Sequence, residues 1–316
     1  MTTAFVFPGQ GSQTVGMGKA LADAFLSARQ VFDEVDAALG ERLSDVIWNG
    51  PGDVLTLTEN AQPALMAVSL ATLRVLEAEA GVDLKRDAAF VAGHSLGEYS
   101  ALAAARALSI SDAARLLRIR GQAMQKAVPV GKGAMAALIG LELGDVKAIA
   151  AEAQSAGICA AANDNGGGQV VLSGDKVAVE RAVEVAKTRG AKRAMLLPVS
   201  APFHCSLMQP AADAMAEALA KVKVNPPLVP LVANVLARPI TDPAEIVKSL
   251  VAQVTGTVRW RECIQFMAQA GVTNFYEVGA GKVLTGLNKR IADAATASSI
   301  GAPDDISRYK AERGAA

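Results

Sequence analysis

Short apolar runs alternate with longer stretches of helical periodicity along much of the chain. The apolar runs are four or five residues long and end at glycine, proline or polar residues, which is typical of buried strands. They lie at residues 4–7, 88–92, 231–235 and 274–278. Between them, apolar residues recur at helical spacing at 13–39, 60–79, 98–107, 111–128, 207–221, 244–254 and 261–270. This alternation predicts an α/β domain built on a parallel sheet.

The pattern changes after residue 128. The stretch 129–133 contains proline and glycine and looks like a linker, and the elements behind it follow the order β-α-β-β-α-β. Strands are expected at 134–139, 158–162, 169–172 and 193–199, and helices at 143–156 and 175–189. That order is typical of a ferredoxin-like unit, with the Asn/Gly cluster at 163–168 as its hairpin. We therefore predict a large α/β domain at 1–128 and 199–316 with an inserted ferredoxin-like α+β domain at 129–198. We expect the polar tail from Gly301 to fray.

Composition limits the classes of function. Hydrophobic residues make up 51% of the 316 positions but aromatic residues only 4%, so the cores must be aliphatic. Thirty-one basic residues balance 31 acidic ones, and aromatic side chains that could stack on bases are scarce, which argues against nucleic-acid binding. No apolar run approaches the roughly 18 residues of a membrane span. A signal peptide begins with a positively charged region, but no basic residue precedes Lys19. We expect a cytoplasmic protein with no membrane partner.

The pentapeptide Gly93-His94-Ser95-Leu96-Gly97 lies between an apolar run and an alanine-rich helical stretch. Gly-x-Ser-x-Gly in this setting predicts a nucleophile elbow, in which a sharp turn exposes the serine hydroxyl. Glycine neighbours let strand and helix pass close to each other. The amide of Leu96 would lie at a helix N-terminus, where it could stabilise an oxyanion. The alternative is a strand-to-helix turn with a serine cap.

A serine needs a base to act as a nucleophile at neutral pH, and the chain has only two histidines. His94 adjoins Ser95, so its side chain should project to the opposite side. His204, 109 positions after Ser95, is the remaining candidate. Its neighbour Cys205 is a rival nucleophile without a second histidine, and a small buried hydrophobe is the simpler interpretation. A backbone carbonyl can orient an imidazole as well as a carboxylate can. The carboxylates available for that task, each of which we interpret as a surface charge, are Asp242, Glu245, Glu262 and Glu277.

Arg120 lies on the helix just after the elbow, and Arg115, Arg118 and Arg120 cannot all share one face. An arginine that points inward needs a carboxylate, because a buried unpaired charge is costly. That carboxylate could belong to the protein or to a substrate held by a bidentate contact.

Nucleotide, metal and disulfide sites are not indicated. The glycine-rich turn after the first strand has Thr14 where a dinucleotide loop has its third glycine, and Lys282 is followed by Val283 where a Walker loop has Ser or Thr. Three cysteines without Cys-x-x-Cys spacing predict neither zinc nor a disulfide framework.

Together these features resemble the malonyl-CoA:acyl carrier protein transacylases of fatty-acid synthesis, over nearly the whole chain. Five motifs carry the likeness in the right order: Phe5-Val6-Phe7-Pro8-Gly9-Gln10-Gly11-Ser12-Gln13, Gly93-His94-Ser95-Leu96-Gly97-Glu98-Tyr99, Ile119-Arg120-Gly121, Pro202-Phe203-His204-Cys205 and Tyr276-Glu277-Val278-Gly279-Ala280-Gly281-Lys282-Val283-Leu284. The resemblance implies a hydrolase-like α/β fold with a ferredoxin-like insertion.

The resemblance also implies a role for each matching residue. Ser95 would accept the malonyl group as an ester, with His204 as general base and then general acid. The amides of Gln10 and Leu96 would form the oxyanion hole, and Arg120 would bind the free malonyl carboxylate. The main-chain carbonyl of Gln253 would orient the histidine. Phe203 would crowd the space of a branched acyl group. Asn165, for which Asn163 is an alternative, would face the site from the hairpin of the smaller domain.

The implied reaction is ping-pong: malonyl passes from coenzyme A to the serine, and then to the phosphopantetheine thiol of acyl carrier protein. No cofactor or metal is expected beyond these substrates, and we expect a monomer. A polyketide-pathway acyltransferase with another extender unit, a serine thioesterase or hydrolase, and a non-catalytic scaffold are the alternatives. Leakage to a methylmalonyl group is expected, because a methyl mismatch is worth only about 1–3 kcal/mol.

Overall fold

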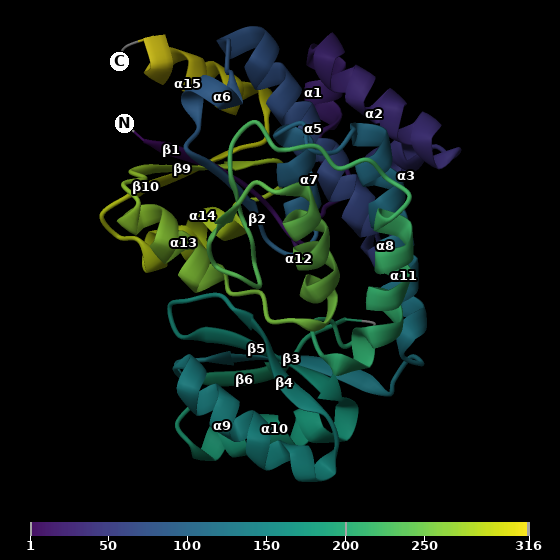
Figure 1. Ribbon diagram of the computed structural model, residues 1–316, viewed down its shortest axis with the longest axis vertical. Helices are drawn as coiled ribbons and strands as arrows, with labels where there is room; N and C mark the ends of the chain where they lie inside the picture. Colours follow the sequence, from purple (N-terminus) through teal and green to yellow (C-terminus); the bar gives the residue numbers. More distant parts are fainter. Residues whose placement is uncertain (1, 200, 315–316) are drawn as a thin grey trace.

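The computed structural model describes residues 2–199 and 201–314, which form a mixed α/β fold with two sheets. The larger sheet has the order β10-β9-β1-β2-β7-β8, and β8 alone runs antiparallel to its neighbour. Its strands are β1 (Thr3–Phe7), β2 (Phe90–Gly93), β7 (Leu231–Val232), β8 (Pro239–Ile240), β9 (Asn274–Val278) and β10 (Thr296–Ile300). The predicted parallel sheet is therefore present, and Figure 1 shows helices on both of its faces.

The central strand β1 explains why the apolar runs are continuous rather than alternating. It lies between β9 and β2, and Ala4 to Phe7 are completely buried. Phe5 and Phe7 pack into one hydrophobic cluster, whereas Ala4 and Val6 pack into another on the opposite face. A parallel strand covered on both faces needs apolar residues at every position.

Each predicted helical stretch of this part contains a helix. The helices are α1 (Lys19–Ala24), α2 (Leu26–Leu39), α3 (Leu43–Asn49), α4 (Gly52–Thr56), α5 (Thr58–Ala80), α6 (Leu84–Asp87), α7 (Gly97–Ala104), α8 (Ile110–Ala127), α11 (Gln209–Leu219), α12 (Pro243–Thr255), α13 (Trp260–Gln269), α14 (Val283–Ile291) and α15 (Pro303–Gly314). Of these, α3, α4, α6, α14 and α15 lie outside the predicted stretches. The single helix predicted at 13–39 is wrong, because Phe25 is extended and separates α1 from α2. The helix predicted at 111–128 begins one residue earlier, because Ser109 caps α8 by accepting from the backbone of Asp112.

The second sheet is antiparallel, with the order β4-β5-β3-β6. Its elements are β3 (Gly133–Ile139), α9 (Leu143–Ala153), β4 (Cys159–Asp164), β5 (Gln169–Asp175), α10 (Lys176–Thr188) and β6 (Arg193–Leu196). Both helices cover the face directed away from the larger sheet, as Figure 1 shows at the bottom of the view. Residues such as Leu138, Ile149 and Val179 give this unit a core of its own. Strand β4 joins it to the rest of the chain, because Val258 exchanges backbone hydrogen bonds with Ala162 and Asp164.

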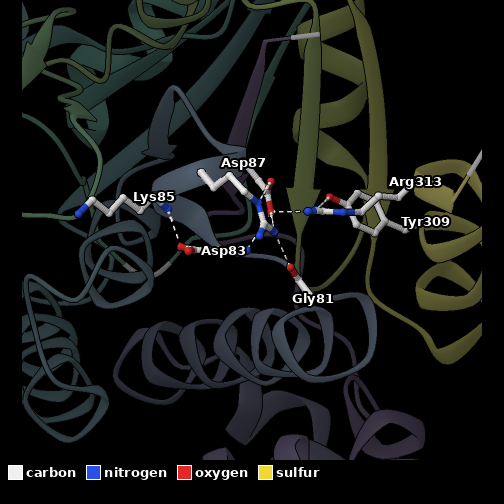
Figure 2. A network of polar contacts seen from close by, with 7 residues as sticks. Gly81, Asp83, Lys85, Asp87, Tyr309 and Arg313 are labelled. Atoms are coloured by element: carbon white, nitrogen blue, oxygen red, sulfur yellow. Dashed lines mark hydrogen bonds and ion pairs between the residues drawn. The ribbon is translucent and has the colours of Figure 1, made fainter. Parts of the chain in front are cut away.

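The C-terminal segment is ordered, so the prediction of a frayed tail is wrong for the residues described up to 314. Strand β10 pairs with β9, and α15 then packs against α5 and β10. Figure 2 shows a further contact of α15: Arg313 donates to the carboxylate of Asp87 at 2.7 Å, 226 positions away. Arg86 and Arg313 both hold the pKa of Asp87 well below its usual range. Tyr309 adds an edge-on ring contact with Tyr276. Ile306 and Tyr309 are the described residues of α15 that are buried in the core, and two such positions are too few to form a clear apolar stripe in the sequence.

Helices α5 and α8 cross closely at Gly121, which gives a stability prediction. A Cβ at Gly121 would lie 2.7 Å from the backbone nitrogen of Glu59, and backbone cannot move aside cheaply. We expect Gly121→Ala to lower the free energy of unfolding by about 1–3 kcal/mol, because overpacking outweighs the gain in helix propensity. Gly286→Ala in α14 is the control: nothing lies within 4 Å of its Cβ. It should gain about 0.5–1 kcal/mol. Urea unfolding of both variants measures the difference, and equal stability would contradict the prediction.

Candidate active site

Ser95 stands at a turn that only glycine neighbours permit. Its φ of 53° lies in the left-handed region, where a side chain is strained. A Cβ at Gly93 would lie 2.6 Å from the backbone nitrogen of Glu98, and one at Gly97 would overlap the carbonyl oxygen of Phe7. A hydrogen bond also holds the turn in place, because the amide of Ser95 donates to the side-chain oxygen of Asn234 at 2.8 Å. The hydroxyl is therefore held at the carboxyl edge of β2.

The structure brings Ser95 and His204 together across 109 positions. Ser95 Oγ lies 2.8 Å from His204 Nε2, and His204 Nδ1 lies 2.8 Å from the main-chain oxygen of Gln253, in the last turn of α12. With the proton on Nδ1 donated to that carbonyl, Nε2 is free to accept the serine proton. His204 also has a positive φ, 59°, so both members of the pair occupy strained backbone.

The environment keeps His204 neutral. The imidazole is buried, and desolvation, with the charge of Arg120 as a second cause, lowers its pKa to about 3. A neutral imidazole is the form that can take a proton from serine.

No carboxylate orients this imidazole among the described residues. Asp242 caps α12, Glu245 pairs with Arg238 and Glu262 pairs with Arg259, as expected of surface charges. The interpretation of Glu277 as a surface charge is wrong. It is completely buried and accepts from the backbone of Leu284 and from the backbone and hydroxyl of Thr285, at the start of α14.

Cys205 is buried and unsuited to attack. Its thiol donates to the carbonyl of Pro202 at 3.2 Å, and desolvation raises its pKa. Thiol reactivity requires an accessible thiolate, so Ser95 is the only one of the two that the geometry favours.

Arg120 is fully buried beside the serine. Its Nη2 donates to Ser95 Oγ at 3.1 Å and to Gln253 Oε1 at 2.8 Å, and its Nη1 donates to Gln62 Oε1 at 2.7 Å. All three acceptors are neutral, and Nε has no hydrogen-bond partner in the described parts of the chain. Arg115 and Arg118 instead pair with Asp112 and Glu41. No carboxylate of the described residues therefore forms the ion pair that a buried guanidinium requires.

Two backbone amides are available next to the hydroxyl. Leu96 is the N-cap of α7, and Gln10 lies in the turn after β1, within the same cavity. Neither amide donates to an acceptor within the two described ranges. The Gln10 side chain is engaged separately, since its Oε1 accepts from Thr58 at 2.9 Å.

These groups line a cavity of about 480 Å³ between the two sheets. Phe203 and His94 line it, as do Asn163 and Asn165 from the smaller unit. Asn165 Oδ1 lies 2.9 Å from His94 Nε2, which gives the second histidine a partner other than the serine. Both asparagines are buried, so the geometry leaves the choice between them open. No cluster of metal-ligating side chains occurs in residues 2–199 or 201–314. Nor does any helix there have the length and apolarity to cross a bilayer.

Three residues of the site escaped the sequence analysis: Gln62, Glu98 and Asn234. Gln62 binds Arg120, Asn234 binds the amide of Ser95, and Glu98 accepts from both Asn234 and Gln253. One signal was present for Glu98, which is the single charged residue of the alanine-rich helix α7.

Comparison with known proteins agrees with this geometry. Residues 4–304 match the acyl transferase domain family. The chain is 48% identical to the malonyl CoA-acyl carrier protein transacylase of Escherichia coli K12, over 95% of this chain and 96% of that one. It is 44% identical to the Bacillus subtilis protein of the same name, over 96% and 94%.

Solved structures give the same result. An acyl-carrier-protein S-malonyltransferase from Bartonella henselae superposes with a TM-score of 0.97 at 58% identity, over 99% of this chain and all of that one. A malonyl-transacylase in complex with its type II polyketide synthase acyl carrier protein superposes with a TM-score of 0.95 at 41% identity, over 99% and 100%. The chain belongs to the acyl transferase family and, within it, to the malonyl-CoA:acyl carrier protein transacylases.

Proposed function

We propose that this enzyme transfers a malonyl group from malonyl-CoA to the phosphopantetheine thiol of acyl carrier protein, through an ester on Ser95. One observation carries the proposal: Ser95 Oγ lies within hydrogen-bond distance of both a neutral imidazole and a buried guanidinium that lacks a carboxylate. A nucleophile and a carboxylate receptor are thus side by side. The names of the relatives support the same substrates.

In the first half-reaction, the hydroxyl proton of Ser95 passes to His204 Nε2 as Oγ attacks the thioester carbonyl. The negative charge on the carbonyl oxygen is stabilised by the free amides of Gln10 and Leu96. The carbon–sulfur bond then breaks, and His204 returns its proton to the departing coenzyme A thiolate. In the second half-reaction, the carrier thiol gives its proton to His204 and attacks the ester, and the proton finally returns to Ser95.

Arg120 supplies the selectivity for a dicarboxylic acyl group. In a malonyl ester on Ser95, the carbon of the free carboxylate is only three bonds from Oγ. Arg120 contacts Oγ itself, so its guanidinium can reach that carboxylate. The carboxylate would provide the ion pair that the described residues lack. Phe203, beside His204 on the cavity wall, would restrict branching next to the carbonyl. Asn165 would contribute a polar group from the smaller unit.

The same proposal assigns the domains. The turn at Ser95, between a parallel strand and a helix, supports a hydrolase-like nucleophile elbow. The order β4-β5-β3-β6, with two helices on one face, supports a ferredoxin-like domain at 129–198 inserted into a catalytic domain at 1–128 and 199–316. The absence of a cofactor, the monomeric state and the cytoplasmic location stay predictions.

Intact mass spectrometry after exposure to malonyl-CoA tests the covalent step. The wild-type protein should gain one malonyl group, and Ser95→Ala should gain none, because the acceptor oxygen is gone. Added acyl carrier protein should discharge the adduct. Steady release of free malonate, unchanged by carrier protein, would instead show a hydrolase, and no adduct on the wild type would show a non-catalytic scaffold.

Arg120→Ala tests the carboxylate receptor. Because malonyl alone needs an ion pair, we expect acylation by malonyl-CoA to fall at least 100-fold, which corresponds to about 3 kcal/mol for one charged hydrogen-bonded contact. Acylation by acetyl-CoA should be unchanged or faster. Equal losses for the two substrates, measured by adduct formation over time, would contradict the assigned role.

The pH dependence of acylation tests the state of His204. Because its pKa is lowered to about 3, the imidazole stays neutral well below pH 6.5. The neutral base is lost only as the pH falls toward about 3. Between pH 7.5 and 5.5 we expect the acylation rate with malonyl-CoA to change less than about twofold, whereas a histidine with its ordinary pKa would lose about tenfold. Rapid-quench measurements would distinguish these results.

A further inference from the structure

Glu98 is a carboxylate with no exposure to solvent, directly beneath the serine turn. It lies in the first turn of α7, three residues after Ser95. Its Oε1 accepts from the backbone amide of Asn234 at 2.6 Å, and its Oε2 accepts from the side-chain amide of Gln253. Both oxygens therefore face donors. A buried carboxylate in such a place is costly unless its partners require two acceptors.

The contact with Gln253 determines which way that amide points. Gln253 Nε2 donates to Glu98 and also to the main-chain oxygen of Ser95 at 2.9 Å. With the nitrogen fixed on that side, Gln253 Oε1 faces Arg120 Nη2 at 2.8 Å. If the amide turned over, its NH₂ group would face the N–H groups of Arg120, and its oxygen would face two acceptors.

We propose that Glu98 is a specificity-determining positioning residue, which fixes the Gln253 amide so that Arg120 is held in place to receive the acyl carboxylate. This inference rests on the proposed function. No hydrogen bond or ion pair joins Glu98 to Arg120 within the described residues, so Glu98 positions the guanidinium through Gln253. The two groups also interact directly through their charges, without contact. The orientation of the Gln253 side chain does not position His204, because His204 binds the main-chain carbonyl of Gln253 and not its side chain.

Burial has the largest effect on the titration of Glu98. It raises the pKa of this carboxyl group to about 8, although the donors from Asn234 and Gln253 and the charge of Arg120 lower it. Glu98 also accepts a hydrogen bond from the backbone amide of Asn234, and the Asn234 side chain accepts one from the amide of Ser95. These two hydrogen bonds support the turn at Ser95, so their loss should affect the rates with all acyl substrates alike.

Glu98→Gln is the sharpest variant, because it keeps the shape but replaces one acceptor by a donor. Either Asn234 or Gln253 would then face a donor across the contact. We expect acylation of Ser95 by malonyl-CoA to fall at least tenfold and acylation by acetyl-CoA to fall less than threefold. Gln253→Met should lower the malonyl-to-acetyl ratio in the same direction, because it removes the side-chain amide and leaves the main-chain carbonyl on His204. In the double variant, Glu98→Gln should lower the ratio no further.

Glu277→Gln is the matched control. Glu277 is equally buried and also accepts from several donors, but its partners lie at the start of α14. It should lower thermal stability and leave the malonyl-to-acetyl ratio unchanged.

An unchanged ratio in Glu98→Gln, with the rates for both substrates falling together, would overturn the inference and leave Glu98 a purely structural acid. If Glu98→Gln does not fold, an unchanged ratio in Gln253→Met overturns it equally. The proposed function fails separately, when the wild-type protein forms no malonyl adduct.

Discussion

The site is organised by a buried positive charge that no carboxylate contacts within the described residues. Arg120 is buried, its two terminal nitrogens donate to neutral oxygens, and its Nε has no partner in the described chain. Protein interiors normally do not tolerate such a group, because desolvation is not repaid. The arrangement is consistent with a substrate that brings the missing charge. The rest of the site then has a simple requirement: it must hold the serine, the imidazole and the guanidinium rigidly while that charge is absent.

Rigidity comes from close approaches of backbone and from hydrogen bonds over long sequence distances. Gly93 and Gly97 let β2, α7 and the end of β1 meet without side chains between them. Asn234 and Gln253, from two separate segments, then bind the amide and the carbonyl of Ser95. Both reactive residues occupy left-handed backbone that only such surrounding contacts can maintain.

Sequence reasoning worked best where a local pattern has only one physical use. The glycines around Ser95 require a sharp turn, and the scarcity of histidine left His204 as the candidate base. The structure places Ser95 Oγ 2.8 Å from His204 Nε2. Sequence reasoning failed where burial depends on distant segments. Glu98 looks like an ordinary acidic residue in the first turn of a helix, and Glu277 like a surface charge, until the strands around them are assembled. Strand β10 and helix α15 were missed for a related reason, since their few anchoring contacts reach residues far along the chain. The roles of Gln10, Gln253, Phe203 and Asn165 came from resemblance alone and remain to be tested.

The three buried cysteines bear on how this protein coexists with its own substrates. Burial raises the pKa of Cys159 to about 11 and also raises the pKa values of Cys205 and Cys263. Disulfide exchange needs an accessible thiolate. A protein that handles coenzyme A and a pantetheine arm in turn is continually bathed in reactive sulfur, some of it oxidised. Because its three thiols are buried, the chain offers such compounds no accessible cysteine with which to form a mixed disulfide.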